Sequence, residues 1–184
     1  MANEAVVLLQ QRFATRAIEP RPLDEETVAD LIEAARLTPS CSNNQPWHYL
    51  FLRGDEARTK GCACLSADNQ KWACRAPLLI FGWSRLEDDC RSRDGKVYFQ
   101  FDLGLSAMNL MLAATARGLA ARPMAGFSEA KVREAFALPE GAQPLIAIAV
   151  GYPGDDDSHV PDYARGAGRK PRERKPAAEI VTIL

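Results

Sequence analysis

Histidine is scarce in this chain: its 184 residues contain two, His48 and His159, and neither belongs to an H-E-x-x-H motif. A zinc hydrolase is therefore not expected. The chain also lacks a G-x-G-x-x-G segment after a strand, a G-x-x-x-x-G-K-S/T loop and a G-x-S-x-G elbow. These absences exclude a dinucleotide-binding Rossmann unit, a P-loop NTPase and an α/β-hydrolase.

Excess charge and long apolar runs are missing as well. The net charge is −1, so no global attraction to nucleic acid or to a membrane surface is expected. The longest apolar runs, residues 76–83 and 144–150, are too short to span a bilayer. The first residues show neither a basic region nor a cleavage site of a signal peptide, and a cytoplasmic location is expected.

The five cysteines are an odd number, which predicts reduced thiols rather than a disulfide framework. Cys62 and Cys64 form the only close pair, but one intervening residue is not a usual zinc spacing, and no metal site is expected. Partly buried structural thiols are the simpler interpretation. Cys41 is the cysteine most worth testing for reactivity, because it lies in a polar connector.

Helical and strand patterns alternate along the chain, and we expect residues 1–184 to form one domain. This alternation predicts an α+β or α/β fold. The clearest helix follows Asp24, a capping residue, and stops at Thr38-Pro39. Further helices are predicted at residues 6–12, 54–65, 68–73, 96–117 and 128–136, and strands at residues 48–52, 76–84, 119–121 and 144–150.

Residues 154–184 form a polar, Pro/Gly-rich tail that closes on an apolar end, residues 180–184. We expect this C-terminal arm to dock as a strand or an extended segment, on its own body or on a second subunit. His159 lies in the tail and is expected to be solvated. His48 is expected to begin a strand, half-buried.

Several clusters of polar residues are candidates for a binding site. Arg12 and Arg16, like Arg172 and Arg174, are paired cations suited to a phosphate, although each pair is also typical of a solvated basic surface. Residues 39–45 offer hydroxyl, amide and backbone groups that suit a flat polar heterocycle, or else form an ordinary Asn/Ser turn anchored by Trp47. Gly126 permits close approach of a ligand to the backbone.

The order of these clusters resembles the FMN-dependent nitroreductase family. The matching pieces are Arg12 with Arg16, the loop PSCSNNQPW (residues 39–47), Asn69-Gln70, the PMAGF turn (residues 123–127) and RERKP (residues 172–176). The resemblance implies a three-layer α+β sandwich, with a mostly antiparallel sheet between helices, in an intertwined homodimer. It also implies FMN at the subunit interface, with the arginines at its phosphate and residues 39–45 serving the partner's FMN.

The residues that the resemblance implies at the cofactor are Arg12, Phe13, Ala14, Arg16, Pro39, Ser40, Cys41, Asn43, Gln45, Asn69, Pro123, Met124, Ala125, Gly126, Arg172 and Arg174. No side chain is expected to act as a catalytic acid or base, because the flavin carries the chemistry.

Three positions depart from the family pattern. Phe13 and Ala14 stand where many members have a basic residue and a serine, and Ala125 stands where some have glutamate.

The activity that the resemblance implies is electron transfer from NADH or NADPH, through FMN, to a small nitro compound or quinone in a ping-pong order. The alternative is a flavin-binding carrier or redox-responsive module without rapid turnover.

Overall fold

The computed structural model describes residues 3–90, 94–167 and 172–184. In this part of the chain one antiparallel sheet has the strand order β1-β2-β4-β3. Its strands are β1 (His48–Leu52), β2 (Leu78–Ser84), β3 (Ala120–Met124) and β4 (Gln143–Gly151). All three pairings are antiparallel, where the family resemblance implied a mostly antiparallel sheet.

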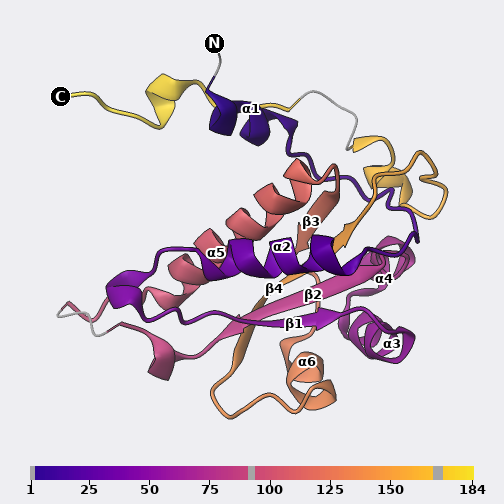
Figure 1. The fold of residues 1–184 in the computed structure, drawn as a ribbon, viewed down its shortest axis with the longest axis horizontal. Helices are drawn as coiled ribbons and strands as arrows, with labels where there is room; N and C mark the ends of the chain where they lie inside the picture. Colours follow the sequence, from indigo (N-terminus) through magenta and orange to yellow (C-terminus); the bar gives the residue numbers. More distant parts are fainter. Residues whose placement is uncertain (1–2, 91–93, 168–171) are drawn as a thin grey trace.

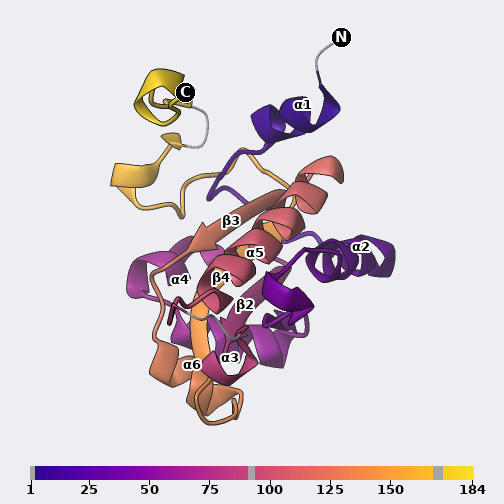
Figure 2. The ribbon, with the colours of Figure 1, turned by 90° about the vertical axis from the view of Figure 1, so that its left-hand side faces the viewer.

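Helices cover both faces of the sheet (Figures 1 and 2). The described helices are α1 (Glu4–Gln11), α2 (Glu25–Arg36), α3 (Asp55–Cys64), α4 (Ala67–Ala73), α5 (Phe99–Ala116) and α6 (Glu129–Ala135). One apolar core joins the sheet to α2 and α5, and a second joins it to α3, α4 and α6. The predicted three-layer α+β sandwich is confirmed.

The central strand β2 shows why a continuous apolar run was required. Leu79 and Phe81 point into the core beside α3, α4 and α6, whereas Leu78 and Ile80 point into the core beside α2 and α5. Each of these side chains is at most 1% exposed. Each stabilises the fold by about 1.5–3 kcal/mol relative to an exposed position, since its apolar surface leaves water.

Helix α2 begins as its sequence predicted, because the Thr27 backbone N–H donates a 2.7 Å hydrogen bond to Asp24 Oδ1. The long helix α5 differs from its prediction: it begins at Phe99, not at residue 96. The Tyr98 backbone N–H donates to Asp89 Oδ2 at 2.8 Å, so the residues before α5 are held by the segment that follows β2.

Strand β3 is longer than predicted and includes Arg122, Pro123 and Met124, which the sequence placed in a turn. The strand lies at the edge of the sheet and pairs with β4 alone. Proline is tolerated there because an edge position leaves its missing N–H on the unpaired side. The pairing places the Arg122 side chain beside the N-terminal segment.

The apolar end of the chain does not dock on its own body, contrary to one of the two predictions for it. After a 3₁₀ turn at Ala177–Glu179, Ile180 and Val181 are 68% and 54% exposed and Ile183 is 93% exposed. The tail instead passes α1, where Arg172 donates to the carbonyl oxygens of Leu9 and Gln10, and it ends on the same side of the sandwich as that helix (Figure 1). None of the described helices has the length and hydropathy that a membrane span requires.

Candidate functional site

The segment between α1 and α2, which carries Arg12 and Arg16, is fixed against the end of β4. Ile18 forms an isolated bridge with Pro153, and the Glu19 backbone N–H donates a 2.9 Å hydrogen bond to the Tyr152 carbonyl. The Gly154 N–H donates to the Ala17 carbonyl at 3.0 Å. These bonds hold the arginine segment at the edge of the sheet formed by β3 and β4.

Arg122 joins this segment from β3. Its Nη1 donates a 2.8 Å hydrogen bond to the Ala14 carbonyl oxygen. Burial lowers the pKa of Arg122, and the nearby Arg16 and Arg12 guanidinium groups lower it further. The structure therefore places three cations close enough to repel one another.

The C-terminal tail brings two more arginines to the same place. Arg172 donates to the carbonyl oxygens of Leu9 at 2.8 Å, of Gln10 at 3.3 Å, and of Arg12. Burial lowers the pKa of Arg12, and repulsion from Arg172 and Arg174 adds to that effect. The predicted convergence of residues 12, 16, 172 and 174, far apart in sequence, is what the fold produces.

Within the described residues, none of these five arginines has an ion pair with an acid. Other arginines of the chain are paired; Arg117, for example, contacts Glu26 and Asp30. A cluster of unneutralised guanidinium groups, some of them partly buried, is costly without an anion. Its donors match phosphate oxygens. We call Arg12, Arg16, Arg122, Arg172 and Arg174 the arginine cluster.

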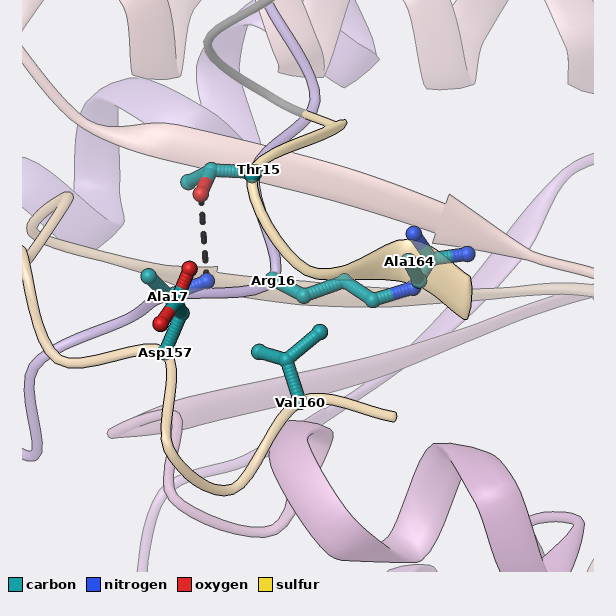
Figure 3. Close-up of a pocket in the computed structure, with 7 residues that line it drawn as sticks. Thr15, Arg16, Ala17, Asp157, Val160 and Ala164 are labelled. Carbon is teal, nitrogen blue, oxygen red and sulfur yellow. Dashed lines mark hydrogen bonds between the residues drawn. The ribbon is translucent and has the colours of Figure 1, made fainter. Parts of the chain in front are cut away.

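A small cavity lies behind Arg16, lined by Thr15, Arg16, Ala17, Asp157, Val160, Ala164 and Gly166 (Figure 3). Thr15 Oγ1 accepts a 3.1 Å hydrogen bond from the Ala17 N–H, and the Arg16 side chain extends beside Ala164. The cavity volume of about 10 Å³ has room for roughly one water molecule. The C-terminal segment thus supports Arg16 from behind, and a larger anion has to bind on the cluster's open side.

Trp72 links the arginine cluster to Asn69 and Gly126. The Arg16 guanidinium lies 5.9 Å from the centre of the Trp72 ring. Trp72 Nε1 donates to Asn69 Oδ1 at 3.2 Å, and Asn69 Nδ2 donates to the Gly126 carbonyl at 3.0 Å. The Arg12–Arg16 pair, Asn69 and the PMAGF turn are therefore neighbours in the fold.

Gly126 has a structural role that its sequence did not reveal. A Cβ atom at this position would lie 2.7 Å from Asn69 Nδ2 and 2.8 Å from Ser66 Oγ, closer than real Cβ contacts allow. The Ser66 N–H also donates to the Gly126 carbonyl at 2.9 Å. The missing side chain thus permits α4 to pack closely against the Gly126 backbone. That a ligand also approaches this backbone stays a prediction.

The amide-rich loop, residues 39–45, lies apart from the arginine cluster. The loop follows α2, whereas the segment that carries Arg16 precedes α2, and the chain enters and leaves this helix at opposite ends (Figure 1). A helix of twelve residues spans about 18 Å. Within one chain the arginine cluster and the amide-rich loop therefore do not meet.

The amide-rich loop has a defined conformation. Ser42, Asn43 and Gln45 have φ values of 53°, 57° and 51°, in the left-handed region that costs energy for residues with a side chain. Ser40 Oγ accepts a 2.9 Å hydrogen bond from the Gln45 N–H. Gln45 Nε2 in turn donates to the Asn43 carbonyl at 3.1 Å. These two bonds fold the loop on itself, and the Asn44 amide ties it to the segment after β2 by donating to the Asp89 carbonyl at 2.9 Å.

The prediction of five reduced thiols is wrong for four of the cysteines. Cys41 is bonded to Cys90 and Cys62 to Cys74, with Cα–Cα separations of 5.7 Å and 5.6 Å. The spacing of the cysteines did not indicate these pairs, because the partners are 49 and 12 residues apart in the sequence and only the fold brings them together. Cys64 is free and buried, as expected, and burial raises its pKa.

The two histidines differ in how well they were predicted. His48 begins β1 as expected, stacks on Trp83 at 4.1 Å between ring centres, and lies 3.1 Å from Asp88 Oδ2. His159 was expected to be solvated, but its side chain is only 12% exposed because the tail folds back near Arg16. The sequence placed Arg122 at the start of the turn after the strand and did not include it among the predicted cofactor residues, whereas the structure places it within β3 and in the arginine cluster.

Comparison with known proteins identifies the class. The sequence profile of the nitroreductase family matches residues 9–68 and 63–152, so the chain belongs to the nitroreductase family. A 4-nitrobenzoate reductase of Pseudomonas putida is 24% identical over 221 aligned positions, which cover 94% of this chain and 93% of the relative. An NADH dehydrogenase of Thermus thermophilus is 25% identical, covering 79% of this chain and 85% of the relative.

Solved structures agree in fold. An oxidoreductase containing FMN superimposes with a TM-score of 0.85 and 28% identity, covering 95% of this chain and 89% of the other. A nitroreductase family protein from Clostridium difficile superimposes with a TM-score of 0.79 and 25% identity, covering 99% and 98%. The similarity extends over the whole sandwich, including the segments that carry the arginine cluster.

Proposed function

We propose that this protein is an FMN-dependent oxidoreductase that takes electrons from NADH or NADPH and passes them to a small organic acceptor. The observation that carries the proposal is the arginine cluster: cations from three distant segments meet without an acidic partner among the described residues. The terminal phosphate of FMN has close to two negative charges near neutral pH, which matches this environment. Relatives that contain FMN or are named for nitro compounds support the assignment.

The groups beside the cluster fit the rest of the cofactor. Asn69 and the backbone of residues 124–126 lie on the same side of the sheet as Arg16, linked to it through Trp72. The Asn69 amide is held by Trp72 and Gly126, so it is oriented before any ligand binds. Met124 is buried and Ala125 is exposed, which leaves the backbone after β3 accessible to a flat ring.

Bound FMN would supply the hydride and electron-transfer chemistry between the nicotinamide and the acceptor, for which we propose a ping-pong order. The chain's own part is to bind and orient. The arginine cluster holds the phosphate, Asn69 and the 124–126 backbone position the ring edge, and the cationic field favours negative charge nearby. The exposed Ala125 offers no carboxylate, so a neutral or anionic acceptor such as a nitro compound or a quinone meets no repulsion there.

The site is completed by a second copy of the chain in this proposal. The amide-rich loop lies at the far end of α2 and cannot reach the cluster of its own chain (Figure 1). Exposed apolar side chains on the helices provide an interface: Val6 and Leu9 on α1, Ile32 on α2, and Phe101 on α5, between 41% and 60% exposed. A homodimer would bury them and bring one chain's loop to the other chain's arginines.

The test begins with the purified protein's visible spectrum and an FMN titration, followed by anaerobic addition of NADH or NADPH. Bleaching of the flavin band, and its recovery on adding a nitroarene or a quinone, is the expected result. Parallel lines in double-reciprocal plots support the ping-pong order, and intersecting lines contradict it. A protein that binds FMN but does not bleach would be a carrier or a redox-responsive module, and one that binds no flavin would refute the proposal.

A further inference from the structure

The disulfide between Cys41 and Cys90 ties the amide-rich loop to the segment that follows β2. Cys41 begins the 3₁₀ turn of the loop, Cys41–Asn43, and Cys90 follows the 3₁₀ turn Leu86–Asp88. The second disulfide, Cys62–Cys74, lies elsewhere and joins α3 to the end of α4. Only the first crosslink acts directly on a loop that we place at the cofactor.

The same two segments are joined by hydrogen bonds. Asn44 Nδ2 donates to the Asp89 carbonyl at 2.9 Å and contacts the Asp88 carbonyl at 3.4 Å. His48 Nε2 meets Asp88 Oδ2 at 3.1 Å, and Ser84 Oγ donates to the Pro46 carbonyl at 2.6 Å. Residues 84–90 therefore pack against residues 41–48 and support them. The disulfide connects the two segments at Cys41, near the start of the amide-rich loop.

The first residues of the loop have few other restraints. The Cys41 N–H donates a 3.0 Å hydrogen bond to Asp102 Oδ2 on α5, and Ser40 bonds only within the loop. Ser42, Asn43 and Gln45 all hold left-handed backbone conformations, which persist only when their surroundings enforce them. Loss of the covalent link should let this part of the loop sample other conformations.

We propose that Cys41 and Cys90 form a reversible dithiol–disulfide couple that sets how tightly the cofactor site closes. This inference rests on the proposed function, because it assigns the amide-rich loop to the flavin. The oxidised couple holds the loop in the conformation seen here, and the reduced couple leaves it to its hydrogen bonds. Preorganisation of this kind raises affinity without adding a contact.

The chemistry is thiol–disulfide exchange with a low-molecular-weight disulfide as the oxidant. The Cys41 thiolate attacks one sulfur of that disulfide and releases one thiol, and Cys90 then attacks the Cys41 sulfur and releases the second. The two cysteines lose two protons and two electrons, and the small disulfide gains them. Cys41 reacts first because it is half-buried, whereas Cys90 is 6% exposed.

The experiment equilibrates the full-length protein in buffers of glutathione and glutathione disulfide at several ratios. Alkylation followed by peptide mass spectrometry reports the state of each cysteine. The FMN dissociation constant and the rate of proteolytic cleavage within residues 39–47 of the apo-protein are measured at each ratio. We expect reduction of Cys41–Cys90 to raise the dissociation constant by about five- to tenfold and to speed cleavage.

Two variants separate the crosslinks. Cys90→Ser should show the weaker affinity and faster cleavage at every ratio, and Cys74→Ser, which removes the other disulfide, should keep the wild-type response. Equal affinity in the oxidised and reduced wild-type protein would overturn the proposal, even if cleavage differs. Loss of FMN binding in both states would refute the proposed function, while a cleavage rate that still follows the redox ratio would keep the couple as a control of the loop.

Discussion

Arg122 on β3 donates a 2.8 Å hydrogen bond to the carbonyl oxygen of Ala14, 108 residues earlier in the chain. This contact joins the edge of the sheet to the N-terminal segment, and it places the Arg122 charge beside Arg12 and Arg16. The sheet therefore positions the proposed phosphate site, since an arginine anchored in a strand moves less than one in a loop.

Replacing Arg122 by Met should raise the FMN dissociation constant about tenfold, which corresponds to about 1.4 kcal/mol. The variant keeps the length of the side chain but removes a cation and the bond to Ala14. Fluorescence titration measures the change, and the control is Arg36→Met, whose partner Glu33 lies on the same surface turn of α2. An unchanged constant in a folded Arg122→Met protein would remove Arg122 from the site.

Gly126→Ala should weaken FMN binding and lower the melting temperature together. Its new Cβ would meet Asn69 Nδ2 at 2.7 Å and Ser66 Oγ at 2.8 Å, so Asn69 must move and its bond to the Gly126 carbonyl lengthens. The matched control is Gly54→Ala, because no atom lies within 4 Å of a Cβ there. Calorimetry and flavin titration of both variants decide the point; equal affinities would show that Asn69 does not depend on Gly126.

Leu79→Ala should reduce the free energy of unfolding by about 2–5 kcal/mol, the usual effect of a cavity in a core. Leu79 is 1% exposed on the central strand and lies in the core beside α3 and α6. Leu86→Ala, at a 60% exposed position, should change the same free energy by at most about 0.5 kcal/mol. Urea unfolding followed by circular dichroism measures both, and similar losses in the two variants would contradict the assigned core.

Asp88 should stabilise the protein in a manner that depends on pH. A hydrogen bond from Arg85, and then one from His48, lowers the pKa of Asp88 from its ordinary 3.8. A carboxyl group with a lowered folded-state pKa stabilises the fold above 3.8, and that contribution is lost as the pH falls through the lowered value. Asp88→Asn should thus cost about 1–2 kcal/mol at pH 7 and less near pH 3.

Urea unfolding at pH 7, 5 and 3 checks this dependence. Asp55→Asn is the control, because the Asp55 side chain is 96% exposed although it contacts Arg58. That variant should cost at most about 0.5 kcal/mol at any of the three values. A penalty for Asp88→Asn that stays constant between pH 7 and pH 3 would mean that its ionisation does not contribute.

Phe101→Asp should convert the proposed homodimer to a monomer and weaken FMN binding at the same time. Phe101 is 60% exposed on α5, and a charge placed in a buried interface is costly. Analytical ultracentrifugation and flavin titration measure the two effects, with Leu86→Asp as an equally exposed control. A monomeric wild-type protein that binds FMN with full affinity would refute the shared site.

Local features of the chain were readable from the sequence. The Asp24 cap and the apolar spacing of Val28, Leu31, Ile32 and Ala35 predicted α2, although Ile32 is 49% exposed in the structure. The apolar run of residues 76–84 predicted a strand buried on both faces, which the structure has as Leu78–Ser84. Both signals depend on interactions within a few residues or on solvent exclusion. The motif order between Arg12 and Arg174 also indicated the family, which the match over residues 9–68 and 63–152 confirmed.

Tertiary structure alone decided what distant residues do to one another. It brought Arg122 into the arginine cluster, paired Cys41 with Cys90, partly buried His159, and left Ile183 exposed. It also separated the amide-rich loop from the cluster by the length of α2. Such contacts depend on the path of the whole chain across the sheet, and no periodicity or spacing along the sequence encodes that path directly.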